Sequence, residues 1–318
     1  MQIVLALVLV TCGAARAQEW PTRPITLVIP YTAGGPTDAV GRLFAMQMSE
    51  SLGFPIVVEN VSGAGGTTGA SRVAQAAPDG YQALFIGSAI TYSQLLYKKP
   101  PFNSVTDFAP VALLTRQPLI LIAPKNLPVE SLQEFTHHLK TKKTVSFGSA
   151  GAGSSSHLGC VMLNLALGTE VTHVPYRGVA PAIQDMIAGR IDYICNLIQD
   201  VIPHVKGGTA KAIANLSRSR SPMLPDLATA DEQGLAGFDI ADWYGIFLPK
   251  DTPPSIVQKL RDVAAAALDT PSFRDRLNGL GVEVVAADRR SPEYLSRFIK
   301  DEIARWAAPV KATGFTVE

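Results

Sequence analysis

The sequence predicts an α/β protein built on largely parallel sheets. Short apolar, β-branched runs alternate with helix-like segments along most of the chain, an alternation typical of α/β architecture. The 318 residues are 47% hydrophobic and 17% charged, which is the composition of a globular protein with a large core. Two stretches, residues 30–38 and 147–157, share one pattern in which a strand, a glycine-rich turn and a helix start follow one another.

The first of these units begins with residues 25–29, an apolar run bounded by prolines that indicates a buried strand. Apolar residues then recur at helical spacing over residues 40–52, and Gly53 supplies the helix stop. Thr37 or Asp38 stands where an N-cap is expected. The unit therefore predicts a strand, a tight turn and an amphipathic helix.

The turn between this strand and this helix has the features of an anion-binding corner. Gly34 and Gly35 allow backbone dihedrals and a close approach that a Cβ atom would prevent. Unpaired N–H groups and the helix dipole then point at one spot. The same features recur at residues 148–157, behind a strand at 145–147 and ahead of a helix at 158–165. The chain is expected to bring these two corners together.

The remaining elements follow from the same signals. Further strands are expected at residues 56–59, 83–88, 119–123, 172–174, 191–195 and 243–249. Further helices are expected after the glycine-rich turn 63–69, after Ser131, after the turn 176–181, around 256–263 and from Ser291 through 306. Residues 217–225 are polar and contain prolines, which predicts a surface loop.

Residues 1–17 are interpreted as a secretory signal peptide. Residues 3–10 form an apolar core, and Ala15, Arg16 and Ala17 match an A-x-A cleavage site, with cleavage after Ala17. The segment lacks a basic start, so the true start codon can lie upstream, and Cys12 leaves a lipoprotein reading open. The protein is therefore expected to be exported, and no later apolar run is long enough to cross a membrane.

Removal of the signal leaves 27 basic residues (28 less Arg16) against 27 acidic residues. Nucleic acid as a partner is not expected, because it favours a basic surface. The same removal leaves Cys160 and Cys195. In an oxidising compartment they can form a disulfide, or they can be two buried free thiols, and the sequence leaves both alternatives open.

Motifs of catalysis and cofactor binding are absent from the sequence. It holds no P-loop, no G-x-S-x-G nucleophile elbow and no H-E-x-x-H, and residues 148–154 do not reproduce the dinucleotide-binding spacing. His137, His138, His173 and His204 lack the spacing of metal ligands. We therefore expect no cofactor, no metal and no enzymatic activity.

Some single residues allow two interpretations. His157 follows three serines, which permits a nucleophile and base, but a capping hydroxyl and a first-turn histidine are the more ordinary reading. Asp38 can be an acid or a helix cap. Arg177 can pair with an anion or lie solvated in a loop. Trp243 and Tyr244 can stack on a ligand or pack between domains.

With these segments in order, the chain resembles the extracytoplasmic solute-binding receptors of the Bug family, the TctC-like receptors of tripartite tricarboxylate transporters. The resemblance covers residue 20 to near the C-terminus. The segments that carry it are residues 21–26 (PTRPIT), 33–38 (AGGPTD), 58–60 with 63–66, 78–81 (PDGY), 107–111 (DFAPV), 148–158, 173–178 with 180–182, and 243–245 (WYG).

The resemblance implies a two-lobed periplasmic binding protein of type II, the Venus-flytrap fold, in which each lobe has a mostly parallel central sheet flanked by helices. Lobe 1 comprises residues 18–121 and 241–318, and lobe 2 comprises residues 122–240. The hinge crossings fall near 119–122 and 239–243. Such a receptor acts as a monomer and delivers its ligand to the membrane subunits of a tripartite tricarboxylate transporter.

In this family the ligand is a small carboxylate held between the first corner of each lobe. The residues that match the family's contacts are Thr32, Gly35, Thr37, Asp38 and Ser88 in lobe 1, and Ser149, Ala152, Gly153, Ser154, Gly178, Ala180 and Asn196 in lobe 2. Receptors of the amino-acid-binding branch resemble this chain around residues 193–195 but carry Asp in place of Asn196. An Asp can pair with a ligand ammonium and an Asn cannot, so we expect a carboxylate without an amino group.

Two other functions remain as alternatives. A secreted serine hydrolase can use residues 154–156 with His157, and a receptor can present its closed form to a signalling partner instead of a transporter.

Overall fold

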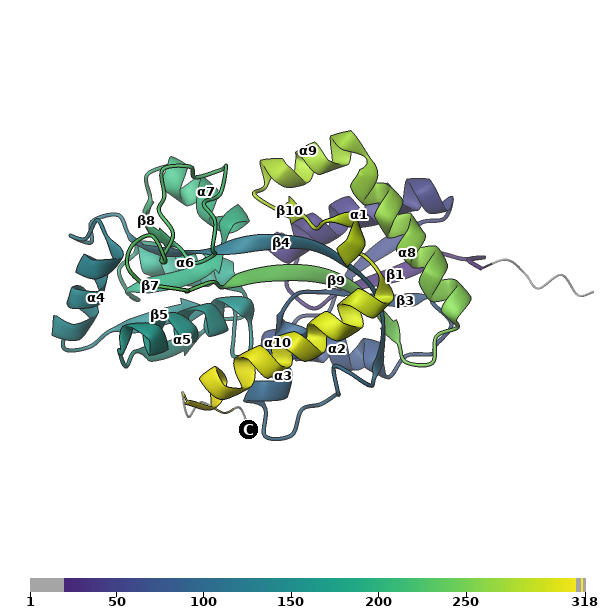
Figure 1. The fold of residues 1–318 in the computed structure, drawn as a ribbon, viewed down its shortest axis with the longest axis horizontal. Coiled ribbons are helices and arrows are strands. Elements are labelled where there is room, and N and C mark those ends of the chain that lie inside the picture. The colour runs from purple at the N-terminus through teal and green to yellow at the C-terminus, as the bar shows by residue number, and fades with distance from the viewer. Residues whose placement is uncertain (1–19, 313–315, 317–318) are drawn as a thin grey trace, which may run out of the picture.

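The computed structural model describes residues 20–312 and residue 316, so the predicted signal peptide and Cys12 lie outside the described residues. Its strands form one curved sheet in the order β2-β1-β3-β9-β4-β7-β5-β6, with β10 and β8 paired to β4. Helices cover this sheet in two groups, which give the molecule two halves joined by β4 and β9 (Figure 1). The predicted α/β class is confirmed.

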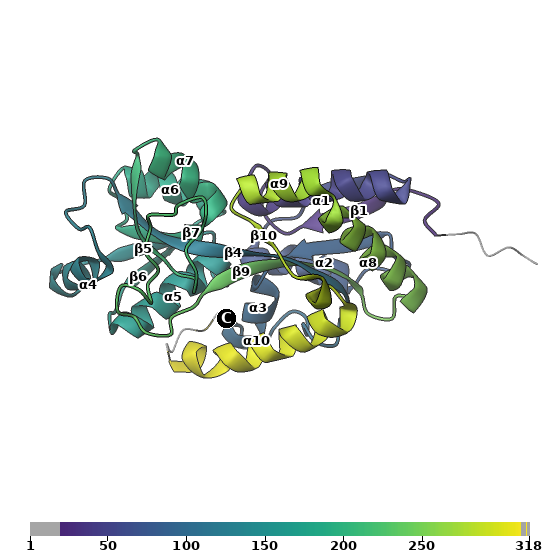
Figure 2. The same cartoon turned by 45° about the horizontal axis from the view of Figure 1, so that its top comes forward.

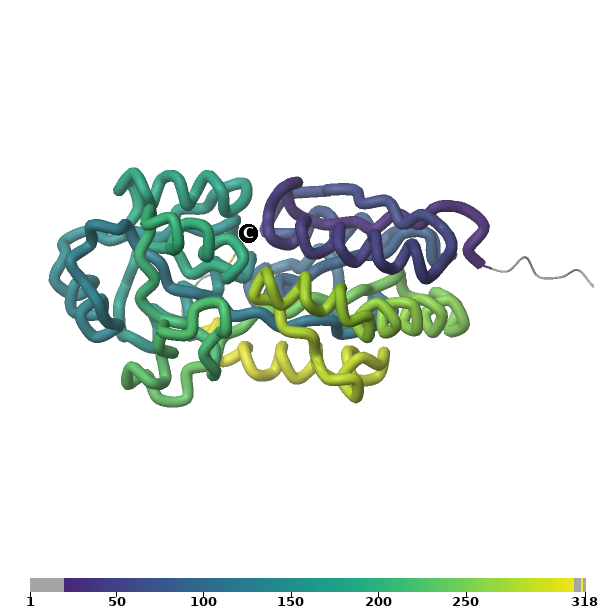
Figure 3. Tube along the Cα trace, turned by 90° about the horizontal axis from the view of Figure 1, so that it is seen from above, coloured from purple at the N-terminus to yellow at the C-terminus, as the bar shows by residue number. Residues whose placement is uncertain are grey.

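The first half is built from both ends of the chain. Its strand β1 (Ile25–Ile29) lies between β2 (Ile56–Asn60) and β3 (Gln82–Ile86), and both pairings are parallel. Its helical elements are α1 (Pro36–Leu52), η1 (Ala64–Gly66), α2 (Thr67–Ala74), α3 (Ala89–Leu96), α8 (Pro254–Asp269), α9 (Pro271–Gly279), η2 (Ala287–Arg289) and α10 (Pro292–Ala312). The short strand β10 (Glu283–Val284) runs antiparallel to β4. Figure 3 shows the purple N-terminal and yellow-green C-terminal segments in this same half.

The second half comes from the middle of the chain. Its strand β5 (Ser146–Ser149) lies between β6 (Thr172–Pro175) and β7 (Tyr193–Leu197), again with parallel pairing. Its other elements are α4 (Leu132–Thr141), α5 (Ser155–Leu167), α6 (Val179–Ile187), α7 (Ile198–Lys206) and β8 (Ala210–Asn215). The sequence pattern did not predict α7 and β8.

Two long strands connect the halves. β4 (Phe108–Pro124) and β9 (Ala241–Pro249) run antiparallel from the Phe108–Pro249 pair to the Pro118–Ala241 pair. From Leu119 onward β4 instead pairs with β7, and from Ile120 also with β8. Both strands pass from one half into the other (Figure 2). The sequence predicted only residues 119–123 of β4 as strand, because the preceding residues lack an uninterrupted apolar run.

The start of α1 differs from the prediction. Its N-cap is Gly35 in an extended conformation, not Thr37 or Asp38, and Pro36 occupies the first helical turn. Proline suits this position because its fixed φ matches the helix and its missing N–H needs no partner there. The predicted stop at Gly53 is confirmed, with φ of +75°. The predicted cap at Ser131 is confirmed, and among the three serines before His157 it is Ser154 that caps α5; each side chain accepts a hydrogen bond from the N–H three residues later.

The helices of the described chain include none that is both long and apolar enough to cross a membrane. Cys160 and Cys195 are free thiols in the structure, so the disulfide alternative is not the one found. Both are fully buried, and the Cys195 backbone N–H donates to Cys160 Sγ at 2.9 Å. This arrangement makes them two small apolar core residues.

We expect the folded structure alone to prevent these two thiols from reacting with thiol reagents. In the native chain lacking residues 1–17, neither Cys160 nor Cys195 should react with Ellman's reagent within minutes, because both are buried. After denaturation without reductant, both should react. A chain that releases no thiol on denaturation until a reductant is added would be disulfide-bonded, contrary to this arrangement.

Candidate functional site

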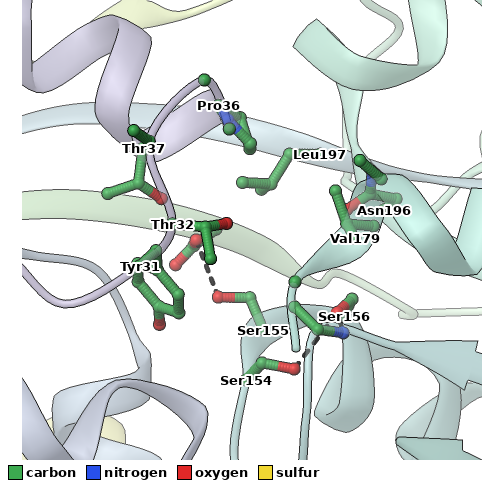
Figure 4. A pocket seen from close by; sticks show the side chains of 17 residues that line it. Tyr31, Thr32, Pro36, Thr37, Ser154, Ser155, Ser156, Val179, Asn196 and Leu197 are labelled. Carbon is green, nitrogen blue, oxygen red and sulfur yellow. Dashed lines mark hydrogen bonds between the residues drawn. The ribbon is translucent and has the colours of Figure 1, made fainter. Parts of the chain in front are cut away.

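A cavity of about 160 Å³ lies between the two halves, at the two predicted corners. Figure 4 shows side chains of the first half, among them Tyr31, Thr32 and Thr37, on one side and those of the second half on the other. The residues that line it are Tyr31, Thr32, Ala33, Gly34, Gly35, Pro36, Thr37, Ala150, Ser154, Ser155, Ser156, Gly178, Val179, Ala180, Asn196, Leu197 and Asp242.

Four helices begin at the wall of this cavity. They are α1 at Pro36, α5 at Ser155, α6 at Val179 and α7, whose N-cap is Leu197. Each helix start carries unpaired N–H groups and the positive end of a helix dipole. No lysine or arginine of the described chain lines the cavity. The site is therefore suited to an anion held by neutral dipoles and hydroxyl groups.

The first corner is fixed by Asp38, which does not itself line the cavity. Its carboxylate accepts hydrogen bonds from the Gly34 N–H at 2.9 Å, from Arg42 Nε at 2.9 Å and from Asn60 Nδ2 at 2.8 Å. Burial acts to raise the pKa of Asp38, but these hydrogen bonds outweigh it and hold the pKa below its usual value. Asp38 thus stays ionised and shapes the turn, and neither of the two roles proposed from the sequence applies to it.

The second corner is fixed by hydroxyl groups. Ser154 Oγ accepts the His157 N–H as the α5 cap and donates to the Gly151 carbonyl at 2.6 Å. Ser156 Oγ accepts the Ala150 N–H at 3.0 Å. Behind the strand, Ser149 Oγ lies 2.7 Å from His173 Nε2. The loop from Ser149 to Ser156 is thereby held in one shape.

Two histidines pack behind this loop. The rings of His157 and His173 have centroids 4.1 Å apart, and His157 Nδ1 accepts the Gly153 N–H at 3.3 Å. Burial, together with the neighbouring His173, lowers the pKa of His157 to about 3. Burial lowers the pKa of His173 to about 4. Both rings are therefore neutral at neutral pH, which makes His157 a weak general base.

Asn196 lies on the cavity wall at the end of β7. Its Nδ2 donates to Asp200 Oδ2 at 3.0 Å, so its amide is oriented by a carboxylate on the first turn of α7. Burial raises the pKa of Asp200 to about 6, against the opposing effect of the Asn196 hydrogen bond. Asn196 thus lies between the cavity and the half-buried Asp200.

Asp242 forms a junction of both halves at the cavity wall. It lies on β9 and is only 2% exposed. Its Oδ1 accepts the Ser88 N–H at 2.9 Å, Ser88 Oγ at 2.5 Å and the Trp243 N–H at 2.9 Å. Its Oδ2 accepts Ser155 Oγ at 2.8 Å, the dashed line drawn from Ser155 in Figure 4. Ser88 belongs to the first half and Ser155 to the second.

The halves also touch through their glycine loops. A Cβ atom added to Gly65 would lie 2.0 Å from the Ala152 carbonyl oxygen, and one added to Gly178 would lie 3.0 Å from Thr32 Oγ1. Such distances show that the two halves are closed on each other here. A second chamber of about 490 Å³, lined also by Tyr97 and Arg177, adjoins the cavity and shares Tyr31, Thr32, Ala150 and Gly178 with it.

The predicted contact residues fall into two groups. Those on the cavity wall are Thr32, Gly35, Thr37, Ser154, Gly178, Ala180 and Asn196. The others support the wall or lie beside it: Asp38, Ser88 and Ser149 make the hydrogen bonds described above, Ala152 lines the second chamber, and Gly153 adjoins Leu96 and Tyr97. Whether each of them contacts a ligand stays a prediction.

Four wall residues with polar side chains were not among the predicted ligand contacts: Tyr31, Ser155, Ser156 and Asp242. Tyr31 directly precedes the glycine turn, Ser155 follows the selected Ser154, and Asp242 lies in the predicted hinge crossing. The only signal for Asp242 was a charged residue beside an otherwise apolar, aromatic strand. Its neighbours Trp243 and Tyr244 are buried and pack on Phe298 and Phe85, so packing, not ligand stacking, describes them.

Metal binding finds no support in the described chain, which contains no cluster of three or more His, Cys, Asp or Glu side chains able to hold an ion. Arg177 is exposed and lines the second chamber, not the cavity. The site is thus a closed cavity whose hydrogen-bond donors are uncharged. Among the described residues that line it, Asp242 contributes a carboxylate.

Comparison with known proteins agrees with this geometry. Residues 40–315 match the TctC model, described as the tripartite tricarboxylate transporter family receptor. The chain is 38% identical to the periplasmic binding protein BugD, with a TM-score of 0.89 over 94% of this chain and 100% of that one. It is 39% identical to MatC from Rhodopseudomonas palustris with bound malate, with a TM-score of 0.88 over 92% and 100% of the two chains.

A further R. palustris protein, solved with adipate, is 33% identical, with a TM-score of 0.88 over 94% of this chain and 99% of that one. These neighbours are binding proteins, not enzymes, and their fold is the two-lobed α/β fold described above. The chain therefore belongs to the TctC family, the receptors of tripartite tricarboxylate transporters.

Proposed function

We propose that this protein is a periplasmic solute-binding receptor that closes on one small carboxylate and delivers it to the membrane subunits of a tripartite tricarboxylate transporter. The proposal that the ligand is a carboxylate rests on one observation. Four helix N-termini converge on a cavity with no basic side chain among its lining residues. Such a site holds an anion through backbone N–H groups and hydroxyls. The malate and adipate bound by two relatives support the same ligand class.

The moving parts of this receptor are its two halves. We infer that residues 18–121 with 241–318 form one lobe and residues 122–240 the other, with hinges near 119–122 and 239–243. The change of β4 from β9 to β7 between Pro118 and Leu119 supports these hinge positions. Rotation about two crossing strands opens the cavity, and a ligand that contacts both halves shifts the equilibrium toward the closed form.

The membrane transporter and the periplasmic location are inferred from membership of the TctC family. In this proposal the signal peptide is cleaved after Ala17 during export. The mature receptor acts as a monomer and delivers its ligand to a TctC-type membrane partner. A sensor that reads the closed form remains the second candidate, because it uses the same closure. Transporter subunit genes beside this gene would favour delivery, and a sensor kinase gene would favour signalling.

A serine hydrolase is less well supported by the site. Ser155 Oγ donates to Asp242, and burial brings the pKa of His157 to about 3, far below that of an efficient base. Ester hydrolysis that disappears in Ser155→Ala would nevertheless favour that activity over binding.

The ligand class can be tested by thermal unfolding of the chain lacking residues 1–17. We expect stabilisation by at least one of acetate, succinate, malate, adipate and citrate, and none by the neutral control succinamide. A ligand at one hundred times its Kd that binds only the folded chain adds about 2.7 kcal/mol of stability. An unchanged unfolding temperature across the whole panel would exclude carboxylate capture.

The ligand is expected to lack an amino group. Asn196 is a neutral amide already bonded to Asp200, so it offers no charge partner to an ammonium group. Calorimetric titration should therefore give weaker binding of aspartate than of malate and of glutamate than of glutarate. Tight aspartate or glutamate binding without binding of the matching dicarboxylates would contradict this expectation.

Closure can be tested with a pair of glycine variants. Gly65 has φ of +64° and a Cβ there would meet the Ala152 carbonyl oxygen across the cleft, whereas Gly53 has φ of +75° and open space around it. Both alanine variants carry the same left-handed strain, roughly 1–2 kcal/mol. We expect Gly65→Ala to weaken carboxylate binding at least about tenfold, equivalent to about 1.4 kcal/mol. Gly53→Ala should lose stability but bind normally, and equal affinities in the two variants would rule out the contact as part of closure.

A further inference from the structure

The wall of the binding cavity contains an acid that the proposed function does not require. Asp242 is 2% exposed and lines a cavity to which no lysine or arginine of the described chain contributes. A buried carboxylate beside a carboxylate ligand places two like charges in one low-dielectric site. Such a pair is costly unless one member takes up a proton.

The oxygen–oxygen contacts around Asp242 allow the protons to be counted. Ser88 Oγ lies 2.5 Å from Asp242 Oδ1, Ser155 Oγ lies 2.8 Å from Asp242 Oδ2, and the two serine oxygens lie 3.2 Å apart. Each serine has one hydroxyl proton. If Asp242 is ionised, both protons point at its carboxylate, and the serine oxygens face each other with none between them.

A protonated Asp242 satisfies all three contacts. Asp242 Oδ2–H then donates to Ser155 Oγ, Ser155 Oγ–H donates to Ser88 Oγ, and Ser88 Oγ–H donates to Asp242 Oδ1. These donors form a closed ring with one proton for each contact. Oδ1 continues to accept the N–H groups of Ser88 and Trp243. The ring is complete only when Ser155 of the second half meets Ser88 of the first half.

We propose that closure of this receptor on its carboxylate takes up one proton, which resides on Asp242 within the Ser88–Asp242–Ser155 ring. This inference rests on the carboxylate binding proposed above and adds to it a dependence on pH. When the halves separate, water reaches Asp242 and the proton leaves. The receptor then binds the carboxylate and a proton together and releases them together.

The other titratable groups around the ring do not supply this proton. Three phenols face Asp242: Tyr31 from the turn after β1, Tyr92 from α3 and Tyr244 from β9. Burial raises the pKa of all three, so they remain neutral. The charges of Glu302 and Arg305 on α10 also shift the pKa of Tyr92, and the charge of Asp200 on α7 raises that of Tyr244.

Three other groups near the ring, His157, His173 and Asp200, could also bind a proton, so their pKa values must be compared with the pH range of the experiment. On the second half, His157 and His173 have pKa values near 3 and 4 because they are buried, so they stay neutral above pH 6. Burial also raises the pKa of Asp242, although its hydrogen bonds from Ser88, Ser155 and Trp243 oppose this rise. Asp200, whose pKa is about 6, is the competitor that the experiment must separate from Asp242.

The sign of the effect follows from linkage. A group whose pKa is higher in the closed, liganded form than in the open form strengthens binding at low pH. This contribution is lost as the pH rises through the closed-form pKa. Between the open-form and closed-form values, the Kd should rise by up to about tenfold per pH unit, the limit for uptake of one proton.

The experiment is calorimetric titration of the chain lacking residues 1–17 with malate at pH 6.5, 7.5 and 8.5. Adipate serves as the probe if the panel shows no malate binding. Carboxylates titrate near pH 4, so the probe remains largely ionised throughout. Titration at each pH in two buffers that contain neither phosphate nor carboxylate and whose ionisation enthalpies differ gives the number of protons taken up per ligand. We expect up to one proton for the wild type and a Kd that rises with pH.

Two matched variants identify the group. Asp242→Asn keeps a neutral ring, because its amide can donate to Ser155 and accept from Ser88, so it should take up no proton and bind with a Kd independent of pH. At pH 8.5 it should bind more tightly than the wild type. Asp200→Asn, the control, should keep the wild-type proton uptake.

Three results would overturn the proposal: no proton uptake by the wild type, uptake that persists in Asp242→Asn, or uptake that disappears in Asp200→Asn. The wild-type proton count alone decides the first of these if Asp242→Asn does not fold. A chain that binds no carboxylate at any pH would refute the proposed function, and this inference with it. Binding without proton uptake would refute only this inference.

Discussion

The antiparallel pairing of β4 with β9 is the constraint on which the rest of the structure depends. These two strands are shared by both halves, so every helix and every parallel strand is positioned relative to them. At Pro118 the pairing with β9 ends, and at Leu119 the pairing with β7 begins. Proline has no N–H to contribute to a ladder, which suits a point where a strand changes partners. The two halves of the sheet therefore meet along one line, and the cavity lies beside that line.

Two opposing electrostatic effects in the cavity determine how strongly it binds an anion. Helix N-termini and hydroxyl groups from both halves provide attraction, and no basic side chain of residues 20–312 lines the wall, so the attraction depends on geometry and not on a single charge. Asp242 acts in the opposite direction, because a buried carboxylate repels an anion unless it is protonated. A site of this composition responds both to the approach of its two halves and to the availability of a proton.

The supporting residues show how this geometry is maintained without contact with the cavity. Asp38 holds the first turn through the Gly34 N–H and is itself held by Arg42 and Asn60. Ser149 and His173 perform a similar function behind the second turn. Substitutions at such positions act through the shape of the turn, so their effect on affinity depends on backbone displacement and not on a lost ligand contact.

The sequence by itself determined the α/β class, most strands and helices, and the two glycine corners, because these depend on local periodicity, glycine conformations and short-range caps. The resemblance to the TctC-like receptors also predicted Thr32, Gly35, Ser154 and Asn196 as contacts, and all four line the cavity. Only the tertiary structure decided that α1 begins at Pro36, that β4 continues through both halves, and that Cys160 and Cys195 are free thiols. It alone brought Ser88, Ser155 and Asp242 together, because they are far apart in the chain and meet only when the two halves fold and close.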